Sequence, residues 1–155
     1  MLRIDRVDPR DARARWCINE YFAELEQRFE AGFSPELSLP ADDEYLVPPR
    51  GAFLMATLRG HPVACGAIIA PRPGVGCVKR MWVAKSSRGI GLGRELLHAI
   101  EQEARSLGLA RLQLETNRSL HEAIALYRTT GYLEVPAFND EPYADLWFEK
   151  TLLQL

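Results

Sequence analysis

The chain has 155 residues, of which 47% are hydrophobic and 26% are charged, and its formal net charge is -2. This length suits a single domain, covering residues 1–155, that buries a core of its own. The small negative charge argues against a nucleic-acid partner, and no apolar run reaches the roughly 18 residues that a membrane span needs. The three cysteines lack metal-type spacing, and the N-terminus lacks a signal peptide's apolar core. We therefore expect a cytoplasmic protein with reduced thiols and no metal.

The N-terminal segment predicts a strand followed by a helix. Residues 2–7 alternate apolar and polar side chains, as a half-buried strand does. Asp8 is placed to cap the helix, Pro9 suits its first turn, and Asp11 lies where a capping-box acid would lie. Gly32 can end this helix.

A long loop is expected from residue 33 to residue 51, because prolines interrupt any long regular element there. These prolines are Pro35, Pro40, Pro48 and Pro49. The loop also carries three consecutive acids, Asp42 to Glu44. We interpret them either as a solvated surface or as a negative rim that attracts a cationic amine.

Three antiparallel strands are expected in the middle of the chain. The apolar runs 52–58 and 62–69 are separated by residues typical of a hairpin, with Gly60 free to adopt positive φ. A turn over 71–74 leads into a third strand over 76–83.

The third strand runs into a loop of Ser, Arg and Gly residues, and a helix begins after this loop, near Gly93. Backbone N–H groups at a helix start have no partner within the helix, and the helix dipole adds positive charge. Glycine lets a phosphate approach the backbone, while Arg88 and Arg94 bracket the loop. The pattern predicts a phosphate or pyrophosphate site.

Two other phosphate-binding motifs do not fit this loop. A dinucleotide fingerprint beginning at Gly89 would end on Arg94 instead of Gly, and the chain has no P-loop lysine motif.

The C-terminal half predicts two helices and three strands, which makes the chain a mixed α/β domain. The first helix has an apolar face over 92–107 and stops at Gly108. The second begins at a capping box over 119–122 and closes at Gly131. The strands are expected at 109–116, 132–135 and 144–152.

Two motifs resemble those of the GCN5-related N-acetyltransferase (GNAT) family. The first is Arg88-x-x-Gly91-x-Gly93 directly after an apolar strand, which is similar to the family's acyl-CoA pyrophosphate motif. The second begins at Asn117 and continues through Leu126-Tyr127 to Gly131-Tyr132. The resemblance covers roughly residues 52–152 and implies a GNAT-like fold, in which helices flank a central, mostly antiparallel, splayed sheet.

The resemblance also implies acetyl-CoA as the cosubstrate and assigns its contacts. Backbone groups of Met81, Trp82 and Val83 would pair with the pantetheine arm, and Asn117 would hydrogen-bond that arm. The strands ending at Val83 and Thr116 would be splayed to admit it. The pyrophosphate would be held by Arg88, Gly89, Gly91, Leu92, Gly93 and Arg94.

Tyr127 matches the family tyrosine that faces the sulfur and would act as general acid, although a packed tyrosine would fit the same position. A backbone N–H near Val83 is expected to stabilise the oxyanion. In the protein-acetylating branch a glutamate serves as base, but Cys77 occupies that position here, and a thiol in an apolar strand is a poor base. Glu115, the acids of 42–44 or a water chain could replace it. Glu115 could equally be a strand carboxylate paired with a Lys or Arg.

The expected function is acetyl transfer from acetyl-CoA to the primary amine of a small molecule, by direct attack in a ternary complex. One alternative acceptor is a protein N-terminus or lysine. A second alternative is a CoA-binding regulatory domain without turnover. A small, acid-lined acceptor pocket would favour the small molecule, and an open groove would favour a peptide. Exposed strand edges near the C-terminus are compatible with a homodimer.

Overall fold

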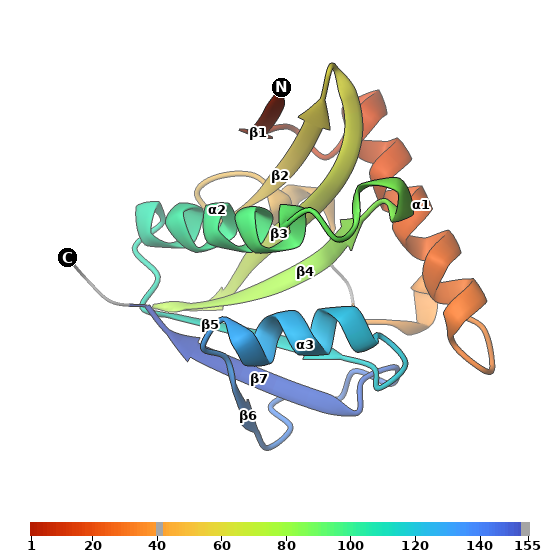
Figure 1. Cartoon of the computed structure of the whole chain (residues 1–155). Coiled ribbons are helices and arrows are strands. Elements are labelled where there is room, and N and C mark those ends of the chain that lie inside the picture. Colours follow the sequence, from red (N-terminus) through yellow and green to blue (C-terminus); the bar gives the residue numbers. More distant parts are fainter. Residues whose placement is uncertain (40–41, 153–155) are drawn as a thin grey trace.

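The computed structural model of the protein describes residues 1–39 and 42–152. Pro40, one of the prolines expected to interrupt the loop, lies outside these residues. The described part forms a mixed α/β fold with one seven-stranded sheet and three α-helices (Figure 1). The helices are α1 (Ala12–Arg28), α2 (Leu92–Ser106) and α3 (His121–Thr129). None of these three helices has both the length and the apolar composition that crossing a bilayer requires.

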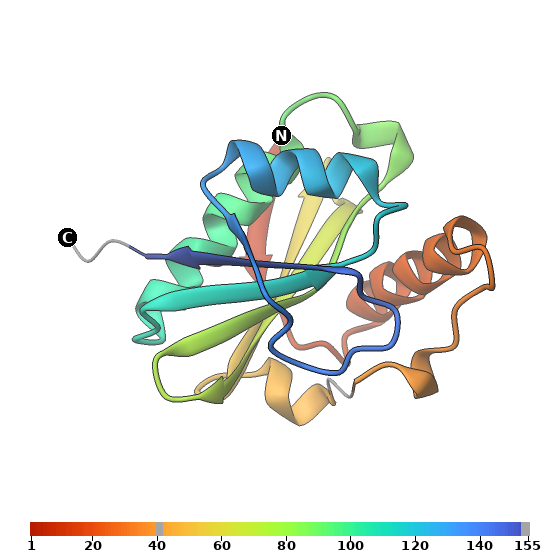
Figure 2. The same ribbon diagram turned by 90° about the horizontal axis from the view of Figure 1, so that it is seen from below.

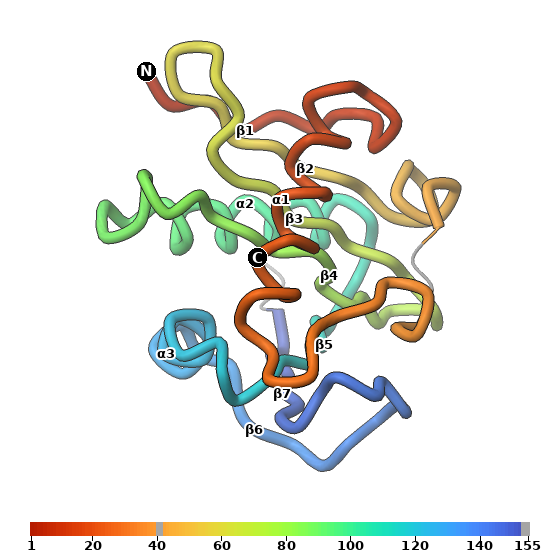
Figure 3. Tube along the Cα trace, turned by 90° about the vertical axis from the view of Figure 1, so that its right-hand side faces the viewer, coloured from red at the N-terminus to blue at the C-terminus, as the bar shows by residue number. Residues whose placement is uncertain are grey.

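The strand order in the sheet is β1-β2-β3-β4-β5-β7-β6, which can be followed from top to bottom in Figure 3. The strands are β1 (Leu2–Arg6), β2 (Gly51–Leu58), β3 (His61–Arg72), β4 (Val75–Val83), β5 (Arg111–Thr116), β6 (Leu133–Val135) and β7 (Leu146–Thr151). Neighbouring strands are antiparallel except β4 and β5, which are parallel. The expected fold class is therefore confirmed.

The two faces of the sheet carry separate cores. On β3, Ala64 and Ile68 pack under α2, whereas Cys65 and Ala67 pack under α1. This alternation follows from the two-residue period of a strand. Consequently α2 and α3 lie together on one side of the sheet, while α1 lies apart from them (Figure 2).

Strands β4 and β5 diverge, as expected for a splayed sheet. They pair only where Val75–Cys77 lie beside Arg111–Gln113, and β4 then continues to Val83 without β5. An irregularity in the β3–β4 register accompanies the divergence, and Arg80 there has a φ of 54°. Such a bulge bends a strand and increases its twist. Beyond Cys77, the edge of β4 that would face β5 is therefore unpaired with that strand.

Helix α1 begins later than expected. The carboxylate of Asp8 accepts a hydrogen bond from the backbone N–H of Arg10 at 2.8 Å, so the chain turns there instead of entering the helix. Asp11 is the N-cap, and its carboxylate accepts from the N–H of Arg13 at 2.8 Å. The helix ends at Arg28, before the predicted stop at Gly32, because the backbone is already extended at the next residue.

The N-cap of α1 can be tested by replacing Asp11 and Asp8 separately. We expect Asp11→Ala to lower the free energy of unfolding by about 1 kcal/mol, the usual value for a lost N-cap. Asp8→Ala should cost less, because Asp8 caps no helix. Chemical denaturation of both variants measures the difference, and a larger loss for the Asp8 variant would contradict the assignment.

The capping box expected over 119–122 does not form. The hydroxyl of Ser119 donates to Oδ1 of Asn117 at 2.7 Å, and Glu122 forms an ion pair with Arg28 of α1 at 2.9 Å. Both side chains of the box therefore have other partners. Helix α3 begins at His121 with no side-chain cap.

Candidate active site

Two cavities meet where β4 and β5 diverge. The first, which we call the glycine-loop cavity, has a volume of about 490 Å³ and lies between α1, the end of β4, the loop 88–94 and α3. The second, the aromatic cavity, has a volume of about 400 Å³ and lies between α1, residues 33–39 with Asp42, β4, β5 and the loop 141–144. The walls that they share are Tyr21, Leu25, Met81, Leu120, Ala123 and Tyr127.

The glycine-loop cavity gathers nearly all the residues that the sequence assigned to a coenzyme. Its walls include Met81, Trp82, Val83, Arg88, Gly89, Gly91, Leu92, Gly93 and Arg94. Gly91 is the N-cap of α2 with a φ of 82°, a conformation that favours glycine, and there is open space where its Cβ would lie. The start of α2 therefore presents unpaired N–H groups to this cavity, as an anion site does.

Arg88, in the wall of this cavity, is held in place by two neighbouring groups of the protein. Its Nε donates to the carbonyl of Val83 at 3.0 Å, and its Nη2 forms an ion pair with Glu24 of α1. Glu24 also pairs with Arg28, at 3.2 Å. The carboxylate of Glu24 therefore bridges two arginines beside the cavity.

Tyr127 lies at the boundary between the two cavities. Its ring is buried against Tyr132 and Phe148, with centroid distances of 5.8 and 5.9 Å. Its hydroxyl contacts Sδ of Met81 at 3.9 Å. Burial, and then the negative charge of Glu115, raise the pKa of Tyr127 above its ordinary value of 10.0. The hydroxyl is therefore protonated and has only a weak partner within the described part of the protein, which leaves it able to donate to a ligand.

Four rings line one end of the aromatic cavity. Phe33 lies 4.7 Å from Tyr143 and 5.5 Å from Phe22, measured between ring centroids, and Phe29 packs against both Phe33 and Tyr143. These rings come from α1, from the loop after it and from the loop before β7. They give the cavity an apolar wall for a ligand.

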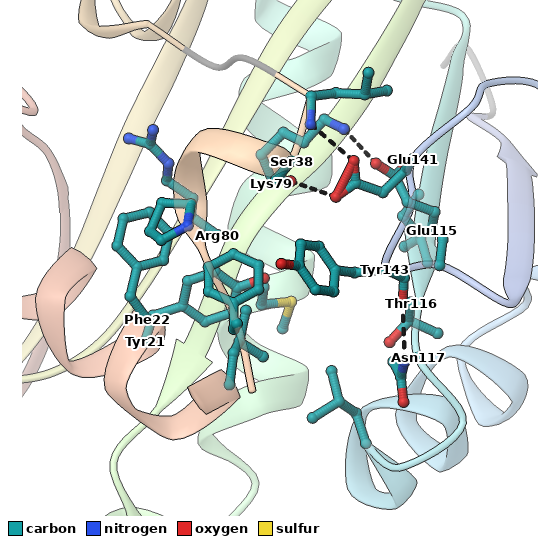
Figure 4. Close-up of a pocket in the computed structure, with 18 of the residues that line it drawn as sticks. Tyr21, Phe22, Ser38, Lys79, Arg80, Glu115, Thr116, Asn117, Glu141 and Tyr143 are labelled. Carbon is teal, nitrogen blue, oxygen red and sulfur yellow. Dashed lines mark hydrogen bonds and ion pairs between the residues drawn. The ribbon is translucent and has the colours of Figure 1, made fainter. Parts of the chain in front are cut away.

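Hydrogen bonds between two loops close this cavity on one side (Figure 4). The carboxylate of Glu141 accepts from the N–H of Leu39 at 2.8 Å and from the hydroxyl of Ser38. The N–H of Ser34 donates to the hydroxyl of Tyr143 at 3.0 Å. The segment 33–39 is thereby fastened to the loop before β7, which closes this side of the cavity.

Glu115, the predicted base, lies in the wall of the aromatic cavity. Its Oε1 forms an ion pair with Nζ of Lys79, and the two side chains are 8% and 14% exposed. Its Oε2 is buried and has no hydrogen-bond partner. Glu115 is thus a strand carboxylate paired with a lysine, as the alternative interpretation held. The pair lines a cavity, and one oxygen of the carboxylate has no hydrogen-bond partner.

The other candidates from the sequence lie outside the glycine-loop cavity. Asn117 lines the aromatic cavity and not the glycine-loop cavity, and its amide nitrogen donates to the carbonyl of Tyr143 at 2.9 Å. Cys77 is buried in β4, and burial raises the pKa of its thiol, which agrees with its interpretation as a poor base. Of the acids in 42–44, only Asp42 lines the cavity, while Asp43 pairs with Arg15.

Several wall residues were not identified from the sequence. The α1 stripe containing Phe22 and Phe29 has the spacing of core residues, and here it faces a cavity. Glu141 and Tyr143 lie in a loop without periodicity, and Arg80 lies in an apolar strand. Within the described residues, no group of three or more His, Cys, Asp or Glu side chains is arranged to hold a metal ion.

Comparisons with known proteins agree with this geometry. A model of the acetyltransferase (GNAT) family matches residues 18–132. An IAA acetyltransferase of Azospirillum brasilense is 36% identical over 148 residues, which are 92% of this chain and 95% of that protein. A solved Klebsiella pneumoniae structure described as an acyl-CoA N-acyltransferase has a TM-score of 0.78 at 31% identity over 99% of both chains. The yncA protein of Salmonella typhimurium, solved with acetyl-CoA, shares the fold with a TM-score of 0.73 at 17% identity, covering 100% of this chain and 96% of that one.

Proposed function

Because the chain belongs to the GNAT acetyltransferase family, we propose that it transfers an acetyl group from acetyl-CoA to the primary amine of a small molecule. The observation that carries this proposal is the meeting of the two cavities at Tyr127 and Met81. A thioester entering from one cavity and an amine entering from the other would come together beside a protonated hydroxyl.

The glycine-loop cavity fits coenzyme A. The unpaired N–H groups at the start of α2, with Arg88 and Arg94 in the wall, suit a pyrophosphate. The edge of β4 beyond Cys77 is free of β5, so backbone groups at Met81 and Val83 can pair with a peptide-like arm. We expect Asn117 to contribute to this arm only if it gives up its bond to Tyr143.

The aromatic cavity supplies the groups that the amine needs. The free Oε2 of Glu115 can accept a proton from the ammonium, directly or through water, so that the amine can attack the thioester carbon. A C–N bond then forms and the C–S bond breaks. Tyr127 donates its proton to the departing thiolate, and the proton that the attacking nitrogen loses as it becomes an amide restores the hydroxyl, directly or through water. The described residues in both cavity walls include no cysteine, which favours direct attack in a ternary complex over a thiol-bound acyl intermediate.

The shape and charge of the aromatic cavity favour a small molecule over a peptide. The fastened loops limit its size, and its walls carry the acids Glu36, Asp42, Glu115 and Glu141. A peptide acceptor would need a groove open at both ends. A regulatory domain without turnover would have no need of an unpartnered carboxylate oxygen in the same cavity wall as Tyr127.

The function is tested by measuring thiol release from acetyl-CoA with a panel of amines, amino acids, polyamines and peptides. We expect turnover with one class of small amines. Turnover with peptides alone would replace the proposed acceptor with a protein. Coenzyme binding without thiol release from any acceptor would favour the regulatory alternative.

The raised pKa of Tyr127 predicts a pH dependence. A group whose pKa is raised stays protonated as the pH increases, so the hydroxyl remains a donor throughout the range in which amines become deprotonated. We therefore expect kcat to rise to a plateau and not to decline between about pH 7 and pH 9. An alkaline decline that disappears in Tyr127→Phe would show that Tyr127 loses its proton within that range.

A further inference from the structure

Tyr21 of α1 lines the junction of the two cavities, and the mechanism above does not use it. Glu24 and Arg28 of the same helix line the glycine-loop cavity, whereas Phe22 and Phe29 line the aromatic cavity. Tyr21 lines both cavities, and Figure 4 shows it beside Phe22 on the α1 side of the aromatic cavity. The helix therefore brings one phenol to the place where a coenzyme and an acceptor would meet.

The hydroxyl of Tyr21 has no hydrogen-bond partner among the residues that the structure describes. The ring packs beside that of Phe22, with centroids 5.7 Å apart, and against the core under α1. The side chain is half-buried, and its oxygen is not among the unpartnered polar atoms that are sealed inside the protein. A ligand at the junction can therefore form a hydrogen bond with this oxygen.

The junction offers an amine few other polar side chains. The walls that the two cavities share are apolar except for Tyr21 and Tyr127. The hydroxyl of Tyr127 contacts Sδ of Met81 at 3.9 Å, and the mechanism assigns its proton to the thiolate. An amine that enters such a site leaves water, and an N–H group without an acceptor costs free energy. Tyr21 is the shared wall residue whose hydroxyl remains to accept from it.

The charge state of Tyr21 suits a binding group and not a base. Burial, and then the negative charges that Tyr127 and Glu115 can carry, raise the pKa of Tyr21 above its ordinary value of 10.0. The phenol therefore stays neutral over the range in which amines become deprotonated. A neutral hydroxyl can accept a hydrogen bond through its lone pairs, but it does not take up a proton at these pH values.

We propose that Tyr21 is a further substrate-binding residue, whose hydroxyl accepts a hydrogen bond from an N–H of the acceptor amine and holds the nitrogen beside the thioester carbon. This inference rests on the proposed function, because it adds a residue to the same site. The bond uses one N–H and leaves the lone pair of the nitrogen available for attack. An acceptor analogue without an N–H at this point would lose the bond and bind more weakly.

The test uses two ligands in which an acceptor is already joined to coenzyme A, so that it needs no turnover. In the first, the sulfur of coenzyme A carries a CH₂–C(=O)–NH–benzyl group. In the second, an ester oxygen replaces the NH. Both carry the same ring into the aromatic cavity, but only the amide has an N–H for Tyr21. We expect calorimetry to show about tenfold tighter binding of the amide, the upper value for one neutral hydrogen bond.

Tyr21→Phe is the decisive variant, because it removes the hydroxyl and keeps the ring. It should bind the amide about tenfold more weakly than the unaltered protein does and the ester equally well. Tyr45→Phe is the matched control, since Tyr45 is 43% exposed and lines neither cavity. This control should keep the preference for the amide.

Equal binding of amide and ester by the unaltered protein would overturn the inference. A Tyr21→Phe variant that keeps the preference, or that weakens both ligands equally, would also overturn it. If the variant does not fold, a crystal structure of the unaltered protein with the amide gives the test without mutation. The amide nitrogen should lie about 2.9 Å from the hydroxyl of Tyr21, and a nitrogen beyond hydrogen-bond reach would contradict the inference.

Failure of the proposed function gives a different result. In that case the amide would still bind more tightly than the ester, and Tyr21→Phe would still remove the difference, but no amine would release thiol from acetyl-CoA.

Discussion

Replacing Tyr127 with phenylalanine is expected to lower kcat by about ten- to a thousand-fold, the usual range for one acid–base group. The hydroxyl lies where the two cavities meet, and its only hydrogen-bond partner among the described residues is the sulfur of Met81. Its removal takes away a proton donor and leaves the ring packing intact. Thiol release at saturating substrates measures the loss, and calorimetry should show coenzyme binding within about twofold of the original protein.

Tyr132→Phe is the matched control for this substitution. The two rings are neighbours, but the hydroxyl of Tyr132 donates to the buried Glu101 at 2.8 Å and lines neither cavity. We expect this variant to lose stability and to keep its kcat. Similar losses of kcat in the two variants would mean that the Tyr127 hydroxyl acts through packing and not through proton transfer.

Glu115→Gln is expected to lower kcat/KM by about a hundredfold, because glutamine cannot accept the proton of an ammonium group. The substitution also removes the anion that neutralises Lys79. The two effects can be separated by Glu115→Asp, which keeps the charge and should recover part of the activity.

The control for this prediction is Glu149→Gln. Glu149 lies on β7, where it pairs with Arg111 at 3.3 Å and accepts from Gln113 at 2.8 Å, and it lines neither cavity. Its loss should leave kcat/KM unchanged. If Glu115→Gln retained full activity, the base would have to be a water chain or another acid.

The order of elements and the glycine loop could be predicted from the sequence because their signals are local. The strand ending at Val83, the glycines and the α2 stripe lie in one continuous segment, and the structure keeps them together. The helix starts were predicted less well. Asp8 and Ser119 are good capping residues, but nearby partners, Arg10 and Asn117, engage their side chains instead.

The aromatic cavity could not be predicted because it is assembled from distant segments. Ser38 and Glu141 are 103 residues apart in the sequence, and Ser34 is 109 residues from Tyr143. A stripe of Phe at helical spacing has the same pattern whether it packs against a sheet or faces a cavity. Only the fold shows that Phe22 lies beside Arg80 and opposite Glu115.

A crystal structure of the protein with coenzyme A tests the central claim most directly. The account predicts that the pyrophosphate lies on the N–H groups at the start of α2, that the arm follows the free edge of β4, and that the thiol lies within hydrogen-bond reach of Tyr127. A coenzyme bound outside the glycine-loop cavity, or a thiol directed away from Tyr127, would contradict it.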